Sequence, residues 1–178
     1  MKKYFIGIVP KGEVGTVTHL IKQDLKENFG LKYALKSPPH VTLKMPFLFN
    51  EKKEGLLVQK LNSFFAREKG FELKFKGFQT FGKRVIYIGV RYPSELLEMQ
   101  IRLAQFCKGK LGQTLELSDT NFKPHMTIAF KDLKKSEFEK YLEFLQKYEM
   151  DYRTIVSEIS ILKKEQFRWK ILDTFKLW

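Results

Sequence analysis

Two short segments of this chain repeat one pattern, and this repeat constrains the fold more than any other feature. Residues 37–47 read SPPHVTLKMPF and residues 122–130 read FKPHMTIAF. In each, a proline is followed by histidine, an apolar residue, threonine and a second apolar residue. The chain has three histidines, and two of them, His40 and His125, lie in these segments. The repeat predicts two equivalent positions in a duplicated fold.

A second repeat supports the duplication. FIGIV (5–9) recurs as YIGVR (87–91), an offset of 87 − 5 = 82 residues. His40 recurs as His125, an offset of 125 − 40 = 85 residues. The two offsets agree to within three residues, and a helical pattern lies between the strand and the histidine in both halves. We therefore expect strand, helix, strand, helix, strand, and then the same order again with one extra strand.

Hydrophobic periodicity and turn residues set the expected element boundaries. They predict an α+β fold with two similar lobes, built from two antiparallel-rich sheets with helices outside, in one domain spanning 1–178. Strands are expected at 3–10, 40–47, 71–82, 84–92 and 125–130, with a closing hairpin of 152–165 and 169–178, and helices are expected at 13–29, 51–69, 94–112 and 136–148.

Composition narrows the class of protein. The net charge of +13 favours anionic partners, although a well-solvated basic surface is the alternative explanation. The longest apolar runs are strand-length, and the N-terminal segment lacks a signal-peptide cleavage pattern, so we expect a cytoplasmic protein with no membrane partner. Cys107 is the only cysteine, which excludes an intrachain disulfide and favours a buried structural thiol.

The spacing within the motif has a chemical meaning. Positions i and i+2 of a strand share a face, so His-x-Thr presents an imidazole beside a hydroxyl. Imidazole gives or takes a proton near neutral pH, and a hydroxyl donates a hydrogen bond to an oxyanion. Two facing pairs, His40 with Thr42 and His125 with Thr127, suit phosphodiester chemistry without a metal or cofactor. One histidine removes a proton, the other protonates the leaving oxygen, and the threonines hold the non-bridging oxygens.

Two structural alternatives compete with this interpretation. The histidines could be core residues bonded to neighbouring hydroxyls in a duplicated fold. A metal site is the weaker alternative, because the same strand faces carry no Asp, Glu or Cys. His19, in the middle of an expected helix and outside the apolar stripe, is interpreted as a surface residue.

HVTL and HMTI, each following a proline in a duplicated basic chain, resemble the two-histidine phosphoesterase superfamily, and within it the LigT-like branch of 2′-5′ RNA ligases and cyclic phosphodiesterases. The resemblance covers essentially the whole chain. It implies a bilobal fold with a central groove that carries both His-x-Thr strands, and metal-independent hydrolysis of a 2′,3′-cyclic phosphate or another RNA-type phosphodiester. It also assigns the attacking water to His125 and the leaving oxygen to His40. Position 130 departs from the pattern, since Phe130 stands where many members carry arginine.

Further residues are candidates for substrate binding. Lys44 and Lys131 are candidates for a phosphate contact, with solvated lysines as the alternative. Phe47 and Phe130, like Phe5 and Tyr87, are candidates for stacking on a base, with core packing as the alternative. The expected partners are RNA ends or small cyclic nucleotides, and the expected state is a monomer. Three other functions stay open: 2′-5′ RNA ligation, cleavage of a 2′-5′ oligonucleotide or a cyclic ADP-ribose phosphate, and RNA binding without catalysis.

Overall fold

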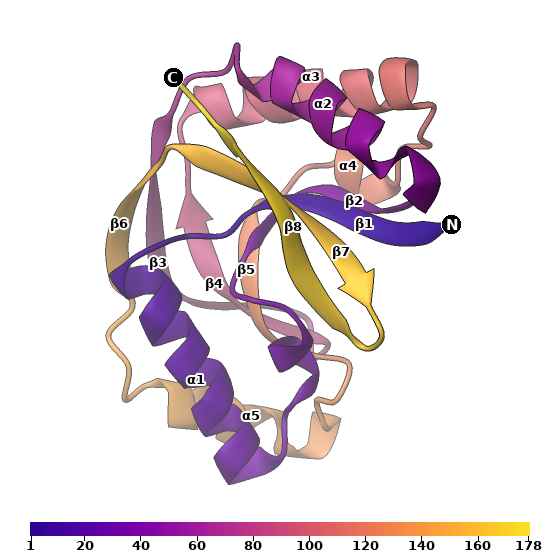
Figure 1. The fold of residues 1–178 in the computed structure, drawn as a ribbon. Coiled ribbons are helices and arrows are strands. Elements are labelled where there is room, and N and C mark those ends of the chain that lie inside the picture. The colour runs from indigo at the N-terminus through magenta and orange to yellow at the C-terminus, as the bar shows by residue number, and fades with distance from the viewer.

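The computed structural model describes every residue from Met1 to Trp178. The strands are β1 (Lys2–Ile8), β2 (Val41–Phe49), β3 (Phe71–Phe81), β4 (Val85–Arg91), β5 (His125–Phe130), β6 (Asp151–Val156), β7 (Glu158–Glu165) and β8 (Arg168–Lys176). The α-helices are α1 (Glu13–Phe29), α2 (Glu54–Phe65), α3 (Ser94–Leu111), α4 (Leu117–Thr120) and α5 (Phe138–Leu145), and 3-10 turns lie at Tyr33–Lys36, Glu51–Lys53 and Lys135–Glu137. Figure 1 shows their arrangement.

Two four-stranded antiparallel sheets correspond strand by strand. One has the order β2-β1-β7-β8 and the other β5-β4-β3-β6. In each sheet a His-x-Thr strand, β2 or β5, forms one edge. The strand that begins that half of the repeat, β1 or β4, lies next to it. This arrangement confirms the α+β fold, the two antiparallel sheets and the outer helices predicted from the sequence.

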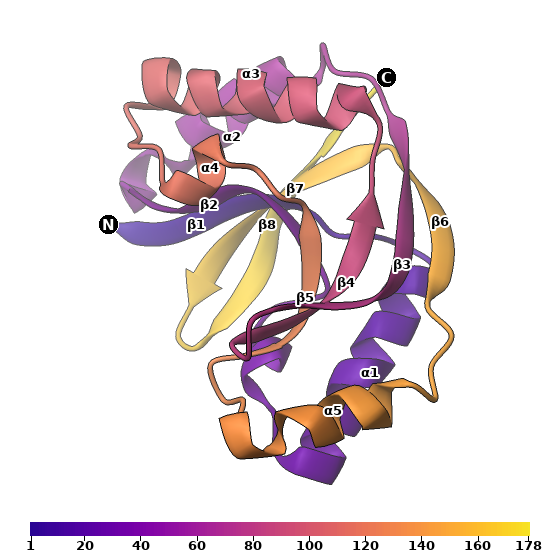
Figure 2. The same ribbon diagram turned by 180° about the vertical axis from the view of Figure 1, so that it is seen from behind.

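The helices lie at the two ends of the molecule, with α2 and α3 at one end and α1 and α5 at the other (Figures 1 and 2). Two of them, α1 and α3, pack against the sheet of the other half. α1 contacts β5 and β6 of the second sheet, and α3 contacts β2 of the first. A single cluster of 34 buried apolar residues draws on both halves. Each half of the repeat therefore completes the core of the other.

The first long helix illustrates how the sequence pattern sets packing. Val14, Ile21 and Leu25 recur on one face of α1 and are fully buried, as the apolar stripe predicted. The helix ends where Gly30 adopts a left-handed conformation and donates its N–H to the carbonyl of Lys26. His19 is exposed on the opposite side of this helix, which confirms its interpretation as a surface residue.

The segment 152–165, expected to be one strand of a hairpin, is divided between the two sheets. β6 pairs with β3, whereas β7 pairs with β1 and β8, and Ser157 separates them. The closing hairpin is confirmed for β7 and β8, which pair antiparallel. The prediction was wrong for residues 152–156, because the local pattern of apolar residues does not reveal a change of partner strand. The helix expected at 51–69 is also shorter. After Phe65 the chain leaves the helix, and residues 68–70 form backbone hydrogen bonds with Trp178.

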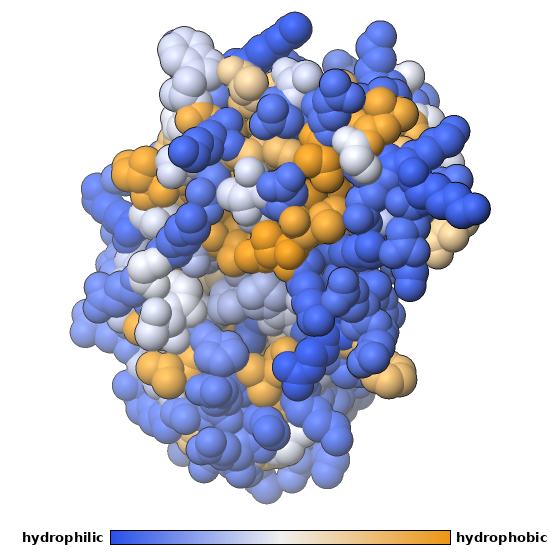
Figure 3. Space-filling view, viewed as in Figure 1, coloured by the Kyte–Doolittle hydropathy of each residue, from blue (hydrophilic) through white to orange (hydrophobic).

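No helix of the structure is both long and apolar enough to cross a membrane. Hydrophilic side chains cover most of the face seen in Figure 3, and apolar side chains gather in the region between α2 and the crossing of β7 and β8. This region lies beside the packing contact between α2 and β8.

Candidate active site

The two His-x-Thr motifs occupy equivalent edge strands that contact each other between the lobes. His40 directly precedes β2, His125 is the first residue of β5, and β2 and β5 are in contact. Because residues i and i+2 share one side of a strand, each threonine follows its histidine on the same side. The fold thus brings both motifs, 85 residues apart, to one place (Figures 1 and 2).

Both imidazoles are oriented by the same backbone contact. Nδ1 of His40 lies 2.8 Å from the carbonyl oxygen of Pro38, and Nδ1 of His125 lies 2.7 Å from that of Lys123. A carbonyl oxygen only accepts hydrogen bonds, so each Nδ1 must carry the hydrogen. Neither Nε2 is used by a hydrogen bond within the protein, and in the neutral ring each Nε2 presents its lone pair.

Aromatic side chains support each imidazole from the adjacent strands. The Phe5 ring lies 4.7 Å from the His40 ring. The rings of Tyr87 and Phe81 lie 5.3 and 5.0 Å from the His125 ring, both edge-on. Phe5 and Tyr87 are equivalent positions of the repeat and are both buried, so they pack against the histidines. Of the two interpretations given for Phe5 and Tyr87, the structure favours core packing over stacking on a base.

The two histidines differ in their electrostatic surroundings. The pKa of His40 is lowered to about 4, chiefly by burial and to a lesser extent by the nearby charges of Lys22 and His125, while the bond to Pro38 opposes the shift. The His40 imidazole is therefore neutral at pH 7. Because His125 is one of the charges that affect this pKa, the two rings are electrostatically coupled.

Lys22 is a buried cation that sequence reasoning did not single out. Its ammonium donates to the carbonyl oxygens of Ala34 and Ser37 at 3.1 and 3.3 Å, and burial lowers its pKa to about 8. These bonds fix the turn that leads into the first motif. Lys22 therefore acts on His40 in two ways, through its charge and by holding the preceding segment.

Lys44 has a position that differs from both sequence expectations. Its side chain is 1% exposed, and its ammonium lies 2.7 Å from a carboxylate oxygen of Asp119, which is equally buried. Asp119 also accepts the backbone N–H groups of Met45 and Glu116. Lys44 thus tethers β2 to the α4 segment and is neither a solvated lysine nor a free phosphate ligand.

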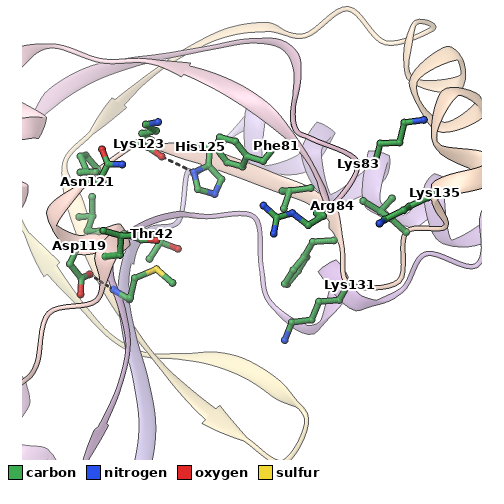
Figure 4. A pocket seen from close by; sticks show the side chains of 18 residues that line it. Thr42, Phe81, Lys83, Arg84, Asp119, Asn121, Lys123, His125, Lys131 and Lys135 are labelled. Carbon is green, nitrogen blue, oxygen red and sulfur yellow. Dashed lines mark hydrogen bonds between the residues drawn. The ribbon is translucent and has the colours of Figure 1, made fainter.

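A cavity of about 780 Å³ opens beside His125. Four of the candidate residues named from the sequence line it: Thr42, His125, Phe130 and Lys131. His40 and Thr127 do not line it, so the cavity extends from the His125 side of the motif pair. Figure 4 shows the lining side chains, with Asn121 and Lys123 at one end and Lys83 and Lys135 at the other.

The three remaining candidates differ in their surroundings: Phe47 lies in the core, whereas Phe130 and Lys131 lie at the cavity. Phe47 is buried in the core, 6.1 Å from the ring of Tyr4, so the structure favours core packing for it. Phe130 is part-buried at the cavity and packs edge-on against Tyr33. Lys131 donates a hydrogen bond to the Tyr33 hydroxyl, which lowers the pKa of that phenol.

No three His, Cys, Asp or Glu side chains lie close enough together to hold a metal ion. Cys107 is fully buried, and burial raises the pKa of its thiol to about 12, in agreement with a structural role. The chemistry-bearing groups at the site are therefore imidazoles, hydroxyls and cations.

Two such motifs, paired across the strands of a bilobal α+β fold, define the two-histidine class of phosphoesterases. A family model described as the 2′-5′ RNA ligase superfamily matches residues 16–167, and the chain belongs to this superfamily.

Relatives in sequence and in structure agree with this assignment. Proteins of Bacillus pumilus and Bacillus cytotoxicus, each named "Putative phosphoesterase", are 26% and 30% identical, over 98% and 86% of this chain and 97% and 86% of theirs. The crystal structure of TT0787 from Thermus thermophilus superposes with a TM-score of 0.72 at 16% identity, covering 98% of this chain and 97% of that one. That of Escherichia coli LigT with 3′-AMP superposes with a TM-score of 0.68 at 18% identity, covering 99% and 98%. At these identities the solved structures bear on the fold.

Proposed function

We propose that this chain is a metal-independent phosphoesterase that hydrolyses a 2′,3′-cyclic phosphate or a related RNA-type phosphodiester. The observation that carries the proposal is the matched orientation of the two imidazoles. Each Nδ1 is occupied by a carbonyl, so both Nε2 atoms are free for proton transfer. Two core histidines satisfied within the fold would have no reason to leave equivalent nitrogen atoms free on contacting strands.

The proposed reaction is an in-line displacement at phosphorus. Water attacks opposite the 3′-oxygen while one Nε2 takes its proton, and the bond between phosphorus and the 3′-oxygen breaks while the other Nε2 protonates that oxygen. The product is a 2′-phosphate with a free 3′-hydroxyl. Thr42 and Thr127 donate hydrogen bonds to the non-bridging oxygens, whose negative charge must be stabilised in the transition state.

The lowered pKa of His40 suggests how the roles divide. A general base must be neutral before reaction, and the lowered pKa of His40 keeps it neutral at pH 7. We therefore assign His40 to the water and His125 to the leaving oxygen. This assignment is the reverse of the one implied by family resemblance.

Two further observations support a nucleotide substrate. The net charge of +13 favours an anionic ligand. Escherichia coli LigT, which has a related fold, has been crystallised with 3′-AMP, ATP and NADP+. Apolar and aromatic side chains at the cavity add surfaces that suit a nucleoside.

The decisive experiment is product identification with a panel of substrates in EDTA. The panel contains nucleoside 2′,3′-cyclic phosphates, 2′-5′ linked dinucleotides, and RNA fragments with 2′,3′-cyclic phosphate and 5′-hydroxyl ends. Hydrolysis to 2′-phosphates that survives chelation supports the proposal. Joining of the RNA ends would identify ligation as the reaction, and RNA binding without any product would identify a binding module. Activity that is lost in EDTA and restored by a divalent ion would indicate a different site chemistry.

A further inference from the structure

The cavity beside His125 is larger than the reacting group requires. Its volume of about 780 Å³ lies in the range of sites for drug-sized ligands, whereas the reacting phosphate group alone needs only a small part of that space. Four segments form its walls: β2, the end of β3 with the β3–β4 turn, α4 with its connection to β5, and the end of β5 with the loop that follows it. The cavity therefore has room for a part of the substrate away from the reacting phosphorus.

The cavity carries a large excess of positive charge. Five cationic side chains line it: Lys83, Arg84, Lys123, Lys131 and Lys135. The one carboxylate in the lining, Asp119, is already bound to Lys44 in the core.

Among the five cations, one has an ion pair. Lys83 lies 3.8 Å from Glu139, and both side chains are more than half exposed, so this contact is weak. Arg84, Lys123, Lys131 and Lys135 have no carboxylate partner. Unpaired cations around a concave, partly apolar surface attract an anionic group of a ligand.

Arg84 is the cation best placed to bind such a group. It occupies the tight turn that follows Phe81, where its N–H donates to the Phe81 carbonyl. In Figure 4 its guanidinium lies between His125 and the Lys131–Lys135 segment, whereas the ammonium of Lys83 points away. A guanidinium presents a planar set of donors that binds phosphate through two parallel hydrogen bonds.

We propose that this cavity is a second phosphate subsite, in which Arg84, assisted by Lys131 and Lys135, binds a phosphate group of the substrate other than the one that reacts. The proposal rests on the proposed function for the identity of the reacting group. It names the substrate class as a nucleotide with a phosphate at its 5′ position. That phosphate is either a terminal monoester or the diester that joins the next nucleotide of an RNA end.

Paired substrates test the subsite. Adenosine 2′,3′-cyclic phosphate is compared with the same compound carrying a 5′-phosphate, and with a dinucleotide that ends in a 2′,3′-cyclic phosphate. We expect kcat/KM to rise about tenfold or more with the added phosphate, mainly through KM, since a hydrogen-bonded ion pair contributes at this level. A larger gain for the 5′-monoester identifies a small nucleotide, and a larger gain for the dinucleotide identifies an RNA end. Equal kcat/KM for all three compounds would overturn the subsite.

The variant Arg84→Met should remove this advantage, so that the ratio of kcat/KM between the compounds with and without the 5′-phosphate falls to about one. Arg67→Met is the matched control, because Arg67 is exposed, follows α2 and has no ion pair. The control should keep the full advantage. If both variants reduce the advantage equally, the effect is one of overall charge and the subsite is refuted.

A binding measurement separates failure of the subsite from failure of the proposed reaction. Adenosine 3′-phosphate and adenosine 3′,5′-bisphosphate are titrated into the intact protein by calorimetry at fixed salt. We expect the bisphosphate to bind about tenfold or more tightly, and Arg84→Met to abolish this difference. An absent difference, or one that survives in Arg84→Met, overturns the subsite even if hydrolysis is confirmed. A difference that depends on Arg84 supports it even if no substrate in the panel is hydrolysed.

Discussion

The Nδ1 atoms of His40 and His125 are bound by carbonyl oxygens two residues before them, at 2.8 and 2.7 Å. The match extends below the rings, where Phe5 and Tyr87 come from equivalent strands. The match does not extend to the charged surroundings, because the charge of Lys22 is one of the causes that lower the pKa of His40. The fold therefore supplies two similarly oriented proton-transfer groups in unlike surroundings, which is what a reaction with one base and one acid requires.

Removal of either imidazole should abolish most of the activity. We expect His40→Ala and His125→Ala each to lower kcat by two orders of magnitude or more, since general acid–base catalysis contributes about 10²–10⁴-fold. His19→Ala, which removes the exposed histidine of α1, is the control and should keep full activity. Thermal unfolding of all three variants checks that folding is retained. Near-normal turnover in His40→Ala or His125→Ala would refute the paired mechanism.

The assignment of base and acid requires more than a pH profile. The profile of kcat/KM should be bell-shaped, but the same bell results if the two protonation states are exchanged. A substrate whose 3′ leaving oxygen is replaced by sulfur distinguishes the roles, because a thiolate leaves with little help from an acid. With His40 as base, His125→Ala should recover much of its lost rate on this substrate and His40→Ala should not. Recovery by His40→Ala alone would restore the assignment implied by family resemblance.

The low pKa of His40 also predicts how stability changes with pH. The unfolded chain binds a proton at this residue near pH 6.5, whereas the folded chain does so near pH 4. Between these values the unfolded state holds more protons, so the free energy of unfolding falls as pH decreases from 6.5 to 4. Above pH 6.5 the contribution is constant.

Urea unfolding at pH 7 and pH 4.5 measures this effect. In His40→Asn the loss of stability on acidification should be smaller than in the wild type by on the order of 1–2 kcal/mol, after allowance for the partial exposure of the ring. His19→Asn should lose as much as the wild type. Identical losses in His40→Asn and the wild type would show that His40 titrates normally in the folded protein.

Particular residues explain which features were predictable from the sequence. The two motifs and the strand that begins each half are local patterns that occur twice, so the fold class and the superfamily followed from them. The pairing of Lys44 with Asp119 joins residues 75 positions apart, and no periodicity reports such a partner. Arg84 lies in a turn that the antiparallel pairing of β4 with β5 places beside Phe130 and the loop after β5. The division of 152–165 between two sheets likewise depends on neighbouring strands.

The buried pair of Lys44 and Asp119 predicts an asymmetric response to mutation. Asp119→Ala leaves a buried ammonium without its carboxylate and also frees the N–H groups of Met45 and Glu116. We expect it to lower the free energy of unfolding by about 3–5 kcal/mol. Lys44→Met fills the same space with an apolar chain and leaves the carboxylate with two N–H donors, so it should cost less.

The double variant Lys44→Met/Asp119→Asn removes both charges and keeps an acceptor oxygen for one of the two backbone donors. It should be more stable than Asp119→Ala, and in a double-mutant cycle with Lys44→Met and Asp119→Asn the two changes should be non-additive by more than about 1 kcal/mol. Urea unfolding at pH 7 measures the wild type and the four variants. Additive effects would mean that the pair is not coupled. Asp119 also belongs to the cavity wall. Asp119→Ala should therefore raise KM for the 5′-phosphorylated substrate, and the double variant should return KM to the wild-type value.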